Sequence, residues 1–568
     1  MSGHAPDDRG DDRGGDREAG VVLVWMALMI AVLLGMAGLS LDVANWYLQG
    51  SREQKAADAA ALAGAVFLPD DPARAFSTAR DLANRNGYTA GGNTTVTVNQ
   101  EPKRSQLRVT ITRQINNFFG ALLNLPSTTI TRTSVAEFVG PVPMGSPASS
   151  FGDEPTGATT THWSSVYDTD DNQPKFWANI AGPQSTKVNG DAQHALLCQG
   201  ADNCSSGNAD YNANGYFYVV RVPSAPPSGK RLAIEVYDPA FVNVGDHCTD
   251  RLDGAAAVTN PYAPDADVRY GIGDTDPAVR KFCNGDQLFD GTDGDGVPPT
   301  TSFVLRSPSV TPWEPLSFPV MTGACAPKQF QGYDQDLAGA LDSTLPTYDA
   351  SLAQSFRQWV RVCTIDTPVP AGDYLLQVRT NVRLDDDPAG PADYTTPGGG
   401  HNRFAVRAAF VTPAGTNPES AGISIFGNAS MSIYANAPSA NTQFHLARVP
   451  SGSGGHTLSL NFFDVADASG VGTLTVIAPP DSGVTFSNCT GIGPAAGALP
   501  TCSVSTTSAF NGKWQTVKVP IPEGYACDDT DPQGCWVRIE YDYGTGSTVA
   551  DTTTWTAVIE GDPVRLVE

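Results

Sequence analysis

One uncharged apolar run near the N-terminus constrains this chain more than any other feature. Residues 20–41 read GVVLVWMALMIAVLLGMAGLSL, with no Asp, Glu, Lys or Arg among them. About 20 such residues span a bilayer as an α-helix. The alternative is a cleaved signal peptide, but its apolar region is usually about 7–15 residues long, and no small-x-small cleavage pattern follows Leu41 here. The run therefore predicts a retained transmembrane helix, with the membrane lipid bilayer as a partner.

The residues on either side of this run predict its orientation. Arg9, Arg13 and Arg17 precede it, and the acidic residues among them count for little in setting topology. The first 197 residues contain no Cys, whereas ten follow. Disulfides persist mainly outside the cytoplasm. We therefore expect a single-pass protein of the cell membrane, with a cytoplasmic N-terminus and extracytoplasmic C-terminal domains.

The cysteines themselves predict a set of local disulfides. Their number is even and their order suggests that neighbours pair, although spacing alone does not determine connectivity. Zinc would need CxxC-like pairs or His at ligand spacing, and neither occurs. The predicted pairs are Cys198 with Cys204, Cys248 with Cys283, Cys325 with Cys363, Cys489 with Cys502, and Cys527 with Cys535.

Length and composition predict several domains that are mostly β. A chain of 568 residues exceeds what one core needs. Its net charge of -25 repels nucleic acid phosphates, so we expect no nucleic acid partner. Only 17% of the residues are charged, and 57 Gly and 43 Pro suit short strands joined by turns.

The first quarter of the chain predicts a tail, a long helix and a small α+β unit. Residues 1–19 have no apolar periodicity and predict a disordered cytoplasmic tail. After the apolar run the helical pattern continues, because no Pro occurs before Pro69. The α+β unit is assigned to residues 42–140. Within it we expect a second helix over 71–86 and strands over 94–98, 107–111 and 128–139.

The order of residues around the apolar run carries a family resemblance. Gly20 precedes the run, Asp42 follows it, and an aromatic-bearing turn leads to QKAADAAALA at 54–63. This order resembles the N-terminal segment of TadG-like Tad/Flp pilus-assembly proteins. The resemblance covers about residues 1–140. It implies a membrane-anchored component of a bacterial pilus or secretion system, with other pilus-assembly or envelope proteins as partners.

Two departures limit what the resemblance implies. Larger family members carry a von Willebrand A-type domain with an Asp-x-Ser-x-Ser metal loop, and this chain contains no such string. Related pilin-like proteins carry Glu five residues into the apolar helix, whereas Trp25 stands there in this chain. We therefore infer neither that domain nor prepilin-type processing.

An internal repeat predicts two β-sandwiches beyond a linker at 141–175. YFYVVRVP at 216–223 corresponds to QFHLARVP at 443–450, and WEPL at 313–316 corresponds to WQTV at 514–517. Alternating strands between turn clusters are typical of jelly-roll and immunoglobulin-like sandwiches, and both remain open. We assign the first sandwich, with insertions, to residues 176–412 and the second to 421–568.

Two acidic residues are candidates for contact with a partner helix. Asp42 follows the apolar run, where it either marks the membrane boundary or contacts another membrane component. Asp58 lies between alanines, and small residues let another helix approach closely. The alternative for the alanines is plain helix propensity.

The predicted sandwiches contain two kinds of candidate ligand site. Asp290, Asp293 and Asp295 lie on a Gly-rich loop that can gather oxygen ligands around Ca²⁺, or form an acidic turn without an ion. Otherwise we expect no cofactor. Six tryptophans are candidates for stacking on a surface carbohydrate, although aromatics in strands usually pack inward: Trp177, Trp313, Trp359, Trp514, Trp536 and Trp555.

The sequence predicts no catalytic residues. GxSxG, HExxH, Walker and dinucleotide-binding motifs are missing. His247 lies beside Cys248 and two Asp, but the sequence places no nucleophile with its own base around it. We expect a non-enzymatic membrane-anchored component of a Tad/Flp-type pilus assembly or secretion system. The alternative is a surface-displayed adhesin or carbohydrate-binding protein, and a third hypothesis is a hydrolase in the insertions of the first sandwich.

Overall fold

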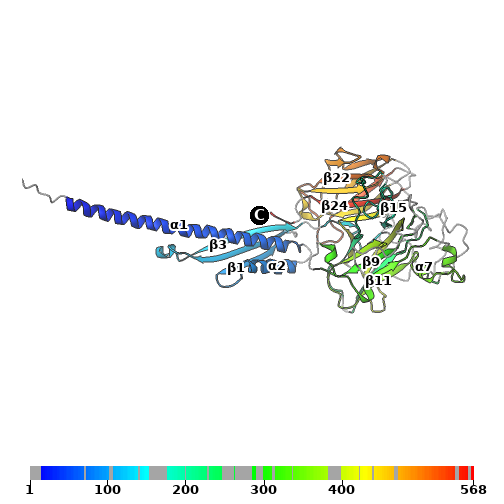
Figure 1. Ribbon diagram of the computed structural model, residues 1–568, viewed down its shortest axis with the longest axis horizontal. Helices are drawn as coiled ribbons and strands as arrows, with labels where there is room; N and C mark the ends of the chain where they lie inside the picture. The colour runs from blue at the N-terminus through cyan, green and yellow to red at the C-terminus, as the bar shows by residue number, and fades with distance from the viewer. Residues whose placement is uncertain are drawn as a thin grey trace, which may run out of the picture. The chain divides into compact units, whose positions relative to one another are not determined.

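The chain folds into two compact units (Figure 1). Unit 1 comprises residues 1–140 and 562–568, and unit 2 comprises residues 141–561. The computed structural model describes residues 15–68, 72–101, 106–138, 141–152, 176–198, 200–226, 229–245, 261–262, 284–288, 298–309, 314–334, 337–381, 398–420, 422–437, 441–465, 471–543, 549–560 and 564–567.

Unit 1 begins with the long helix that the sequence predicts. Helix α1 runs over Gly15–Ala65, a length of 51 residues, and α2 follows at Pro72–Arg85. In the apolar part of α1, every side chain from Val21 to Leu41 is exposed except at Gly38. By length and composition this helix can cross a membrane.

Four antiparallel strands form the sheet of unit 1. The sheet order is β1 (Thr94–Gln100), β2 (Gln106–Asn116), β3 (Ser127–Phe138) and β25 (Val564–Leu566). The sequence predicts the first three strands. It assigned β25 to the second sandwich, because three residues carry no periodicity that identifies their partner.

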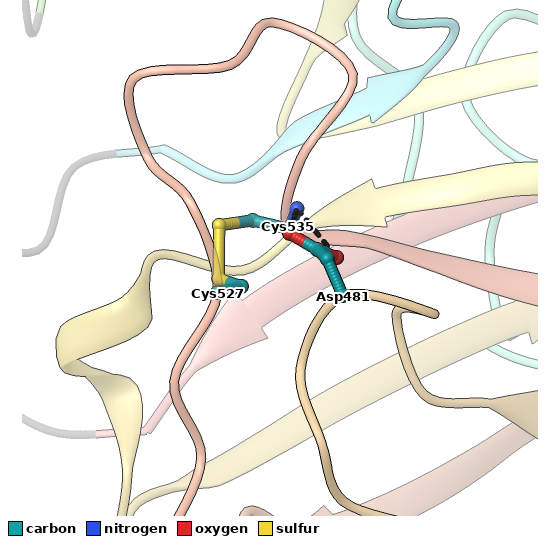
Figure 2. A group of neighbouring side chains, drawn as sticks. All are labelled: Asp481, Cys527 and Cys535. Atoms are coloured by element: carbon teal, nitrogen blue, oxygen red, sulfur yellow. Dashed lines mark hydrogen bonds between the residues drawn. A yellow bond between two sulfur atoms is a disulfide. The ribbon is translucent and has the colours of Figure 1, made fainter.

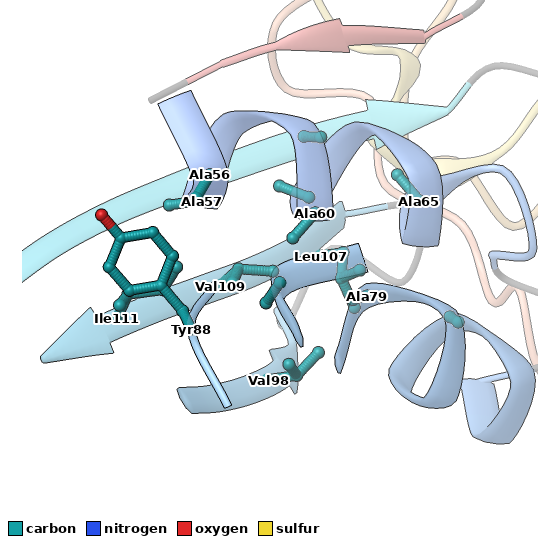
Figure 3. Close-up of a cluster of buried hydrophobic side chains, with 14 of the residues drawn as sticks. Ala56, Ala57, Ala60, Ala65, Ala79, Tyr88, Val98, Leu107, Val109 and Ile111 are labelled. Atoms are coloured by element: carbon teal, nitrogen blue, oxygen red, sulfur yellow. The ribbon is translucent and has the colours of Figure 1, made fainter. Parts of the chain in front are cut away.

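The core of unit 1 depends on small residues of α1. Its alanines pack against α2 and β2, as Figure 3 shows for Ala57, Ala60 and Leu107. A Cβ atom built at Gly64 would lie 2.7 Å from the Ala75 backbone oxygen and 2.4 Å from a Leu107 methyl carbon. The two helices therefore approach closely only because position 64 lacks a side chain.

Unit 2 consists of two large antiparallel sheets. One sheet has the order β10 (Lys328–Phe330), β9 (Thr301–Arg306), β12 (Gly372–Thr380), β7 (Tyr216–Val222), β14 (Ser424–Asn428), β4 (Pro143–Gly145), β16 (Asn441–Arg448), β23 (Trp536–Asp542), β18 (Gly472–Ile477) and β21 (Ser503–Thr506). The other has the order β11 (Trp359–Ile365), β8 (Arg231–Tyr237), β13 (His401–Val411), β6 (Phe176–Ala181), β15 (Ser430–Ala437), β24 (Val549–Ile559), β17 (Thr457–Phe463), β22 (Trp514–Pro520), β19 (Cys489–Ile492) and β20 (Gly497–Leu499), and β5 (Ser150–Phe151) pairs with β13.

Aromatic side chains fill the space between these two sheets. The Phe404 ring of β13 meets Tyr218 of β7 and Phe303 of β9 edge-on, with ring centroids 6.0 and 5.4 Å apart. In the second copy, Phe444 of β16 meets Trp555 of β24 at 6.2 Å. Sheets that face each other across such a core form a β-sandwich, which confirms the predicted fold class.

The two predicted sandwiches are joined edge to edge. Strand β4 pairs with β14 in one sheet, and β6 pairs with β15 in the other. Strand β4 precedes the first copy but lies next to β16 of the second, and β14 lies next to β7 of the first. The predicted linker at 141–175 is corrected accordingly, because residues 143–145 and 150–151 are strands; residues 153–175 lie outside the described residues.

Equivalent turns identify the repeat and correct its alignment. Asp238 and Asp464 directly follow strands β8 and β17, with φ of 48° and 59°. Each carboxylate accepts a backbone N–H, from Arg357 and Gly512 respectively. The strand after each donor begins with Trp359 in one copy and Trp514 in the other. Trp359 is therefore the counterpart of Trp514, and Trp313 lies outside the described residues.

Four of the predicted neighbour pairs are disulfides in the structure. They join Cys198 to Cys204, Cys325 to Cys363, Cys489 to Cys502 and Cys527 to Cys535. Cys248 and Cys283 lie outside the described residues. All four bonds lie in unit 2.

Short helices connect the strands and build the insertions of the first copy. Two of them pack on Val242 and Val244 in a separate apolar cluster, and the others are single 3₁₀ turns. They are α6 (Leu337–Leu341), α7 (Ala350–Ser355), η1 (Gly120–Leu123), η2 (Lys187–Asn189), η3 (Pro315–Ser317), η4 (Gly323–Cys325), η5 (Ser451–Ser453) and η6 (Ser508–Phe510).

The close approach of α1 and α2 predicts an effect of Gly64→Val. The added side chain meets backbone at Ala75, so we expect unit 1 to lose about 1–3 kcal/mol of stability. Thermal unfolding of the full-length protein in detergent, with hydrogen exchange in β1–β3, measures this loss. Gly35→Ala is the matched control in the same helix, because no atom lies within 4 Å of its built Cβ. Equal stability of both variants would contradict the packing.

The return of the chain to unit 1 predicts an effect of removing residues 562–568. Strand β25 covers the edge of β3, and Arg565 forms a 3.0 Å ion pair with the buried carboxylate of Glu137. Without it, Glu137 loses this ion pair and β3 loses a neighbouring strand, so we expect unit 1 to unfold more readily by about 1–3 kcal/mol. Hydrogen exchange of the β3 amides measures this loss of stability, and we expect it to be faster in the truncated protein. Unchanged exchange would contradict the prediction.

Candidate functional site

The candidate site lies on α1, where its apolar exposed part ends. Gly38, Asp42 and Trp46 follow one another at intervals of four residues and therefore share one face of the helix. The loop between β2 and β3, residues 117–126, covers this face. We call these three α1 residues together with residues 117–120 the exit site.

The carboxylate of Asp42 is the centre of the exit site. Its two oxygens accept the backbone N–H groups of Phe118 at 2.7 Å, Phe119 at 2.9 Å and Gly120 at 2.6 Å. Asp42 is fully buried. Hydrogen bonds from several N–H groups to a carboxylate are charge-assisted, and they offset the cost of taking the charge out of water.

Two further contacts hold the loop along the helix. The Trp46 indole Nε1 donates to the Asn117 side-chain oxygen at 2.8 Å. The Phe119 ring lies against Gly38, where a built Cβ atom would be only 2.6 Å from ring carbons. The loop thus touches α1 from Trp46 back to Gly38, which belongs to the apolar run itself.

These contacts change the interpretation of Asp42 as a residue for partner helices. The sequence predicts either a position at the membrane boundary or a contact with another membrane component, and the structure places Asp42 directly after the exposed apolar part of α1. Its oxygens, however, bind the loop of the same chain, and no part of its side chain is exposed. In this structure Asp42 organises its own unit. Sequence periodicity could not show this, because the donors lie more than seventy residues away.

Asp58 and its neighbouring alanines also have contacts within the chain. One Asp58 oxygen accepts the Gln54 side-chain amide at 2.8 Å, and the residue is half-buried. The alanines pack on α2 and β2, so the close helix contact that they predict is made by α2 of the same chain.

Glu53 is a site residue that the sequence analysis missed. It is fully buried on the alanine face, and among the described residues neither carboxylate oxygen has a hydrogen-bond partner. Burial raises the pKa of Glu53 to about 7, although Arg113 and Arg132 act to lower it. The signal was present in the spacing, since Glu53, Ala57 and Ala60 fall on one helical face.

The candidate sites in the sandwiches receive less support. Asp290, Asp293 and Asp295, like His247, lie outside the described residues. Among the candidate tryptophans, Trp177, Trp536 and Trp555 are buried in the core. Trp359 and Trp514 are half-buried and interact with other side chains. The Arg407 guanidinium carbon lies 3.9 Å from the centre of the Trp359 ring. The Trp514 indole N–H donates to an Asp210 carboxylate oxygen at 2.8 Å. These five residues form no exposed platform for a sugar.

One cluster in unit 2 has metal-ligand residue types but a different role. Asp481, Cys527 and Cys535 lie together, as Figure 2 shows. The two sulfur atoms are joined in a disulfide, so neither is a thiolate ligand. The Asp481 carboxylate instead accepts the backbone N–H groups of Cys535 at 3.2 Å and Asp528 at 3.1 Å. The disulfide and these hydrogen bonds stabilise the loop between Cys527 and Cys535.

Comparison with known families finds a match that covers the α1 residues of the exit site but not its loop. Residues 20–66 match a family described as putative Flp pilus-assembly TadE/G-like. The match covers α1 from the apolar run through Asp42, Glu53 and Asp58, and it agrees with the resemblance seen in the sequence. It indicates a role related to Tad/Flp pili and a membrane-anchored protein. No curated protein and no solved structure matches the chain significantly.

The buried Glu53 predicts that the stability of unit 1 depends on pH. Its folded pKa of about 7 exceeds the ordinary 4.5, so the stability that protonation provides is complete below pH 4.5 and lost as pH rises through 7. Glu53→Gln does not titrate. We expect the variant to match the native protein near pH 4.5 and to exceed it by up to about 3 kcal/mol at pH 8. Melting of unit 1 at both pH values measures this, with unit 2 as internal control. A variant equally stable or weaker at pH 8 would oppose the assignment.

Proposed function

We propose that this protein is a non-enzymatic, membrane-anchored component of a Tad/Flp-type pilus assembly or secretion system in the bacterial envelope. Its partners are other pilus-assembly or envelope proteins, and the role needs no cofactor. The observation that carries the proposal is the coincidence of the matched residues 20–66 with helix α1, which contains both the exposed apolar run and the packed alanine face.

The division of α1 into two parts supports an anchor that is also structural. Residues 21–41 expose apolar side chains that only a lipid or protein environment would cover. The following part, to Ala65, belongs to the core of unit 1. A helix continuous through both parts transmits the position of the membrane segment to the folded unit without a flexible hinge.

Charge and the disulfides both support the proposed orientation. Arg9, Arg13 and Arg17 favour a cytoplasmic N-terminus. The four disulfides of unit 2 favour an extracytoplasmic position for the C-terminal part. Both observations support the same topology, a single pass with the sandwich unit outside the cytoplasm.

The competing hypothesis is an anchor that displays a binding protein, such as an adhesin, unrelated to pili. In that case the sandwich unit carries the function and unit 1 serves as a stalk. The two hypotheses can be tested separately, because unit 2 lies in the sequence between β3 and β25, which are adjacent strands of unit 1. Phe138 of β3 lies opposite Val564 of β25 in an antiparallel pair, so a short turn can join them.

This connection allows a decisive experiment in the bacterium that makes the protein. Residues 141–561 are replaced by a short Gly-rich turn, and the resulting minimal protein is expressed in a strain that lacks the full chain. Loss of the full chain should reduce pilus number or secretion, and the minimal protein should restore it at least in part, since α1 and unit 1 are intact. Pili counted by electron microscopy give the readout.

A matched control is the minimal protein with Gly64→Val, which disrupts the α1–α2 packing and should not restore pili. If deletion of the full chain leaves pilus number and secretion unchanged, the assembly role is rejected and the display hypothesis is favoured.

A further inference from the structure

The loop between β2 and β3 exposes a concentrated set of large apolar side chains. A folded unit in water rarely leaves so many together on one short turn. The turn is η1 and its flanks, and the exposed fractions are 69% for Phe118, 41% for Phe119, 82% for Leu122, 68% for Leu123 and 58% for Leu125.

The loop lies beside the apolar run of α1. Asp42, the residue that holds the loop, directly follows Leu41 at the end of that run. The Phe119 ring contacts Gly38, which lies four residues, or about 6 Å of helix, further into the run. Whatever medium surrounds the outer end of the apolar run therefore also surrounds this turn.

The loop contains no charged residue, which suits it to a lipid environment. No Asp, Glu, Lys or Arg occurs between Arg113 and Arg132. The Asp42 charge beside it is buried under three N–H donors, so it presents no bare carboxylate at the membrane edge.

Hydrogen bonds of the loop's backbone N–H groups also suit it to a lipid environment. Unpaired N–H and C=O groups are costly there. Phe118, Phe119 and Gly120 donate to Asp42, whereas Leu122 donates to the Phe119 oxygen at 3.0 Å and Leu125 to the Gly120 oxygen at 2.9 Å.

We propose that this loop is a second membrane contact, which inserts Phe118, Leu122, Leu123 and Leu125 into the boundary between head groups and acyl chains beside α1. The inference rests on the proposed anchoring of α1 in a bilayer. A single helix can rotate about its axis in a membrane, whereas a helix with a second inserted point presents one defined face. The loop thus sets the orientation of unit 1 at the membrane surface.

An apolar protein surface is the competing occupant of the loop. The direct contact between Phe119 and Gly38 favours lipid, because the turn lies against a segment that the proposed anchoring surrounds with acyl chains. A protein partner would need to reach the same depth, and the experiment below distinguishes the two.

The test measures the depth of single fluorescent labels in the full-length protein. The chain is reconstituted in phosphatidylethanolamine–phosphatidylglycerol vesicles, and an environment-sensitive dye is attached to Leu122→Cys without reductant, so that the disulfides stay closed. Leu122 is mostly exposed, so the substitution removes little packing. Asn99→Cys is the matched control on the same sheet, because Asn99 is exposed and pairs with Arg108, about 26 Å along β2 from Asn116. Leu33→Cys reports on the apolar run.

Lipids with brominated chains should quench the labels at 122 and 33, and aqueous iodide should quench the label at 99 alone. If the label at 122 is quenched by iodide while that at 33 is quenched by lipid, the loop inference fails and the anchor stands. If the label at 33 is also open to iodide, the anchor fails and the inference fails with it. If neither reagent reaches 122 and the label becomes lipid-accessible on dilution to one chain per vesicle, a second copy covers the loop and the inference is overturned.

Discussion

Unit 1 depends on the small side chains that α1 presents to its neighbours. Alanine at 57 and 60 and glycine at 64 allow α2 and β2 to pack close to the helix axis. Larger residues would separate these elements, and α1 would then be an anchor attached to an independent sheet. Because the packing is close, one continuous helix belongs to the apolar run and to the core at once. The β25 strand completes this unit from the other end of the chain.

Two buried acids on this helix show how differently a carboxylate can be accommodated. Asp42 has three backbone donors and ties a distant loop to the helix. Glu53 has none among the described residues, and burial raises its pKa to about 7. The first carboxylate contributes an organised contact, whereas the second costs stability whenever it is charged.

In unit 2, pairing between the two copies covers strand edges that would otherwise be exposed. An isolated sandwich leaves exposed N–H and C=O groups at the edges of both sheets. Here β4 pairs with β14 in one sheet and β6 pairs with β15 in the other, so the two copies are joined at these strands. The pairing makes one unit from a duplicated sequence. The disulfides then fasten surface loops, among them the one held by Asp481.

Local pattern in the amino-acid sequence predicts the apolar run, the helix that continues beyond it, three strands of unit 1 and the β-sandwich class. The order of the cysteines suggests neighbour pairing, which the four described disulfides confirm. The tertiary structure alone decided which distant groups meet: Asp42 with the turn at Phe118, β25 with β3, Trp359 as the counterpart of Trp514, and the joined sheets. The physical reason is that strand partners and hydrogen-bond donors far apart in the chain leave no periodic trace, because their pairing depends on geometry that the whole fold creates.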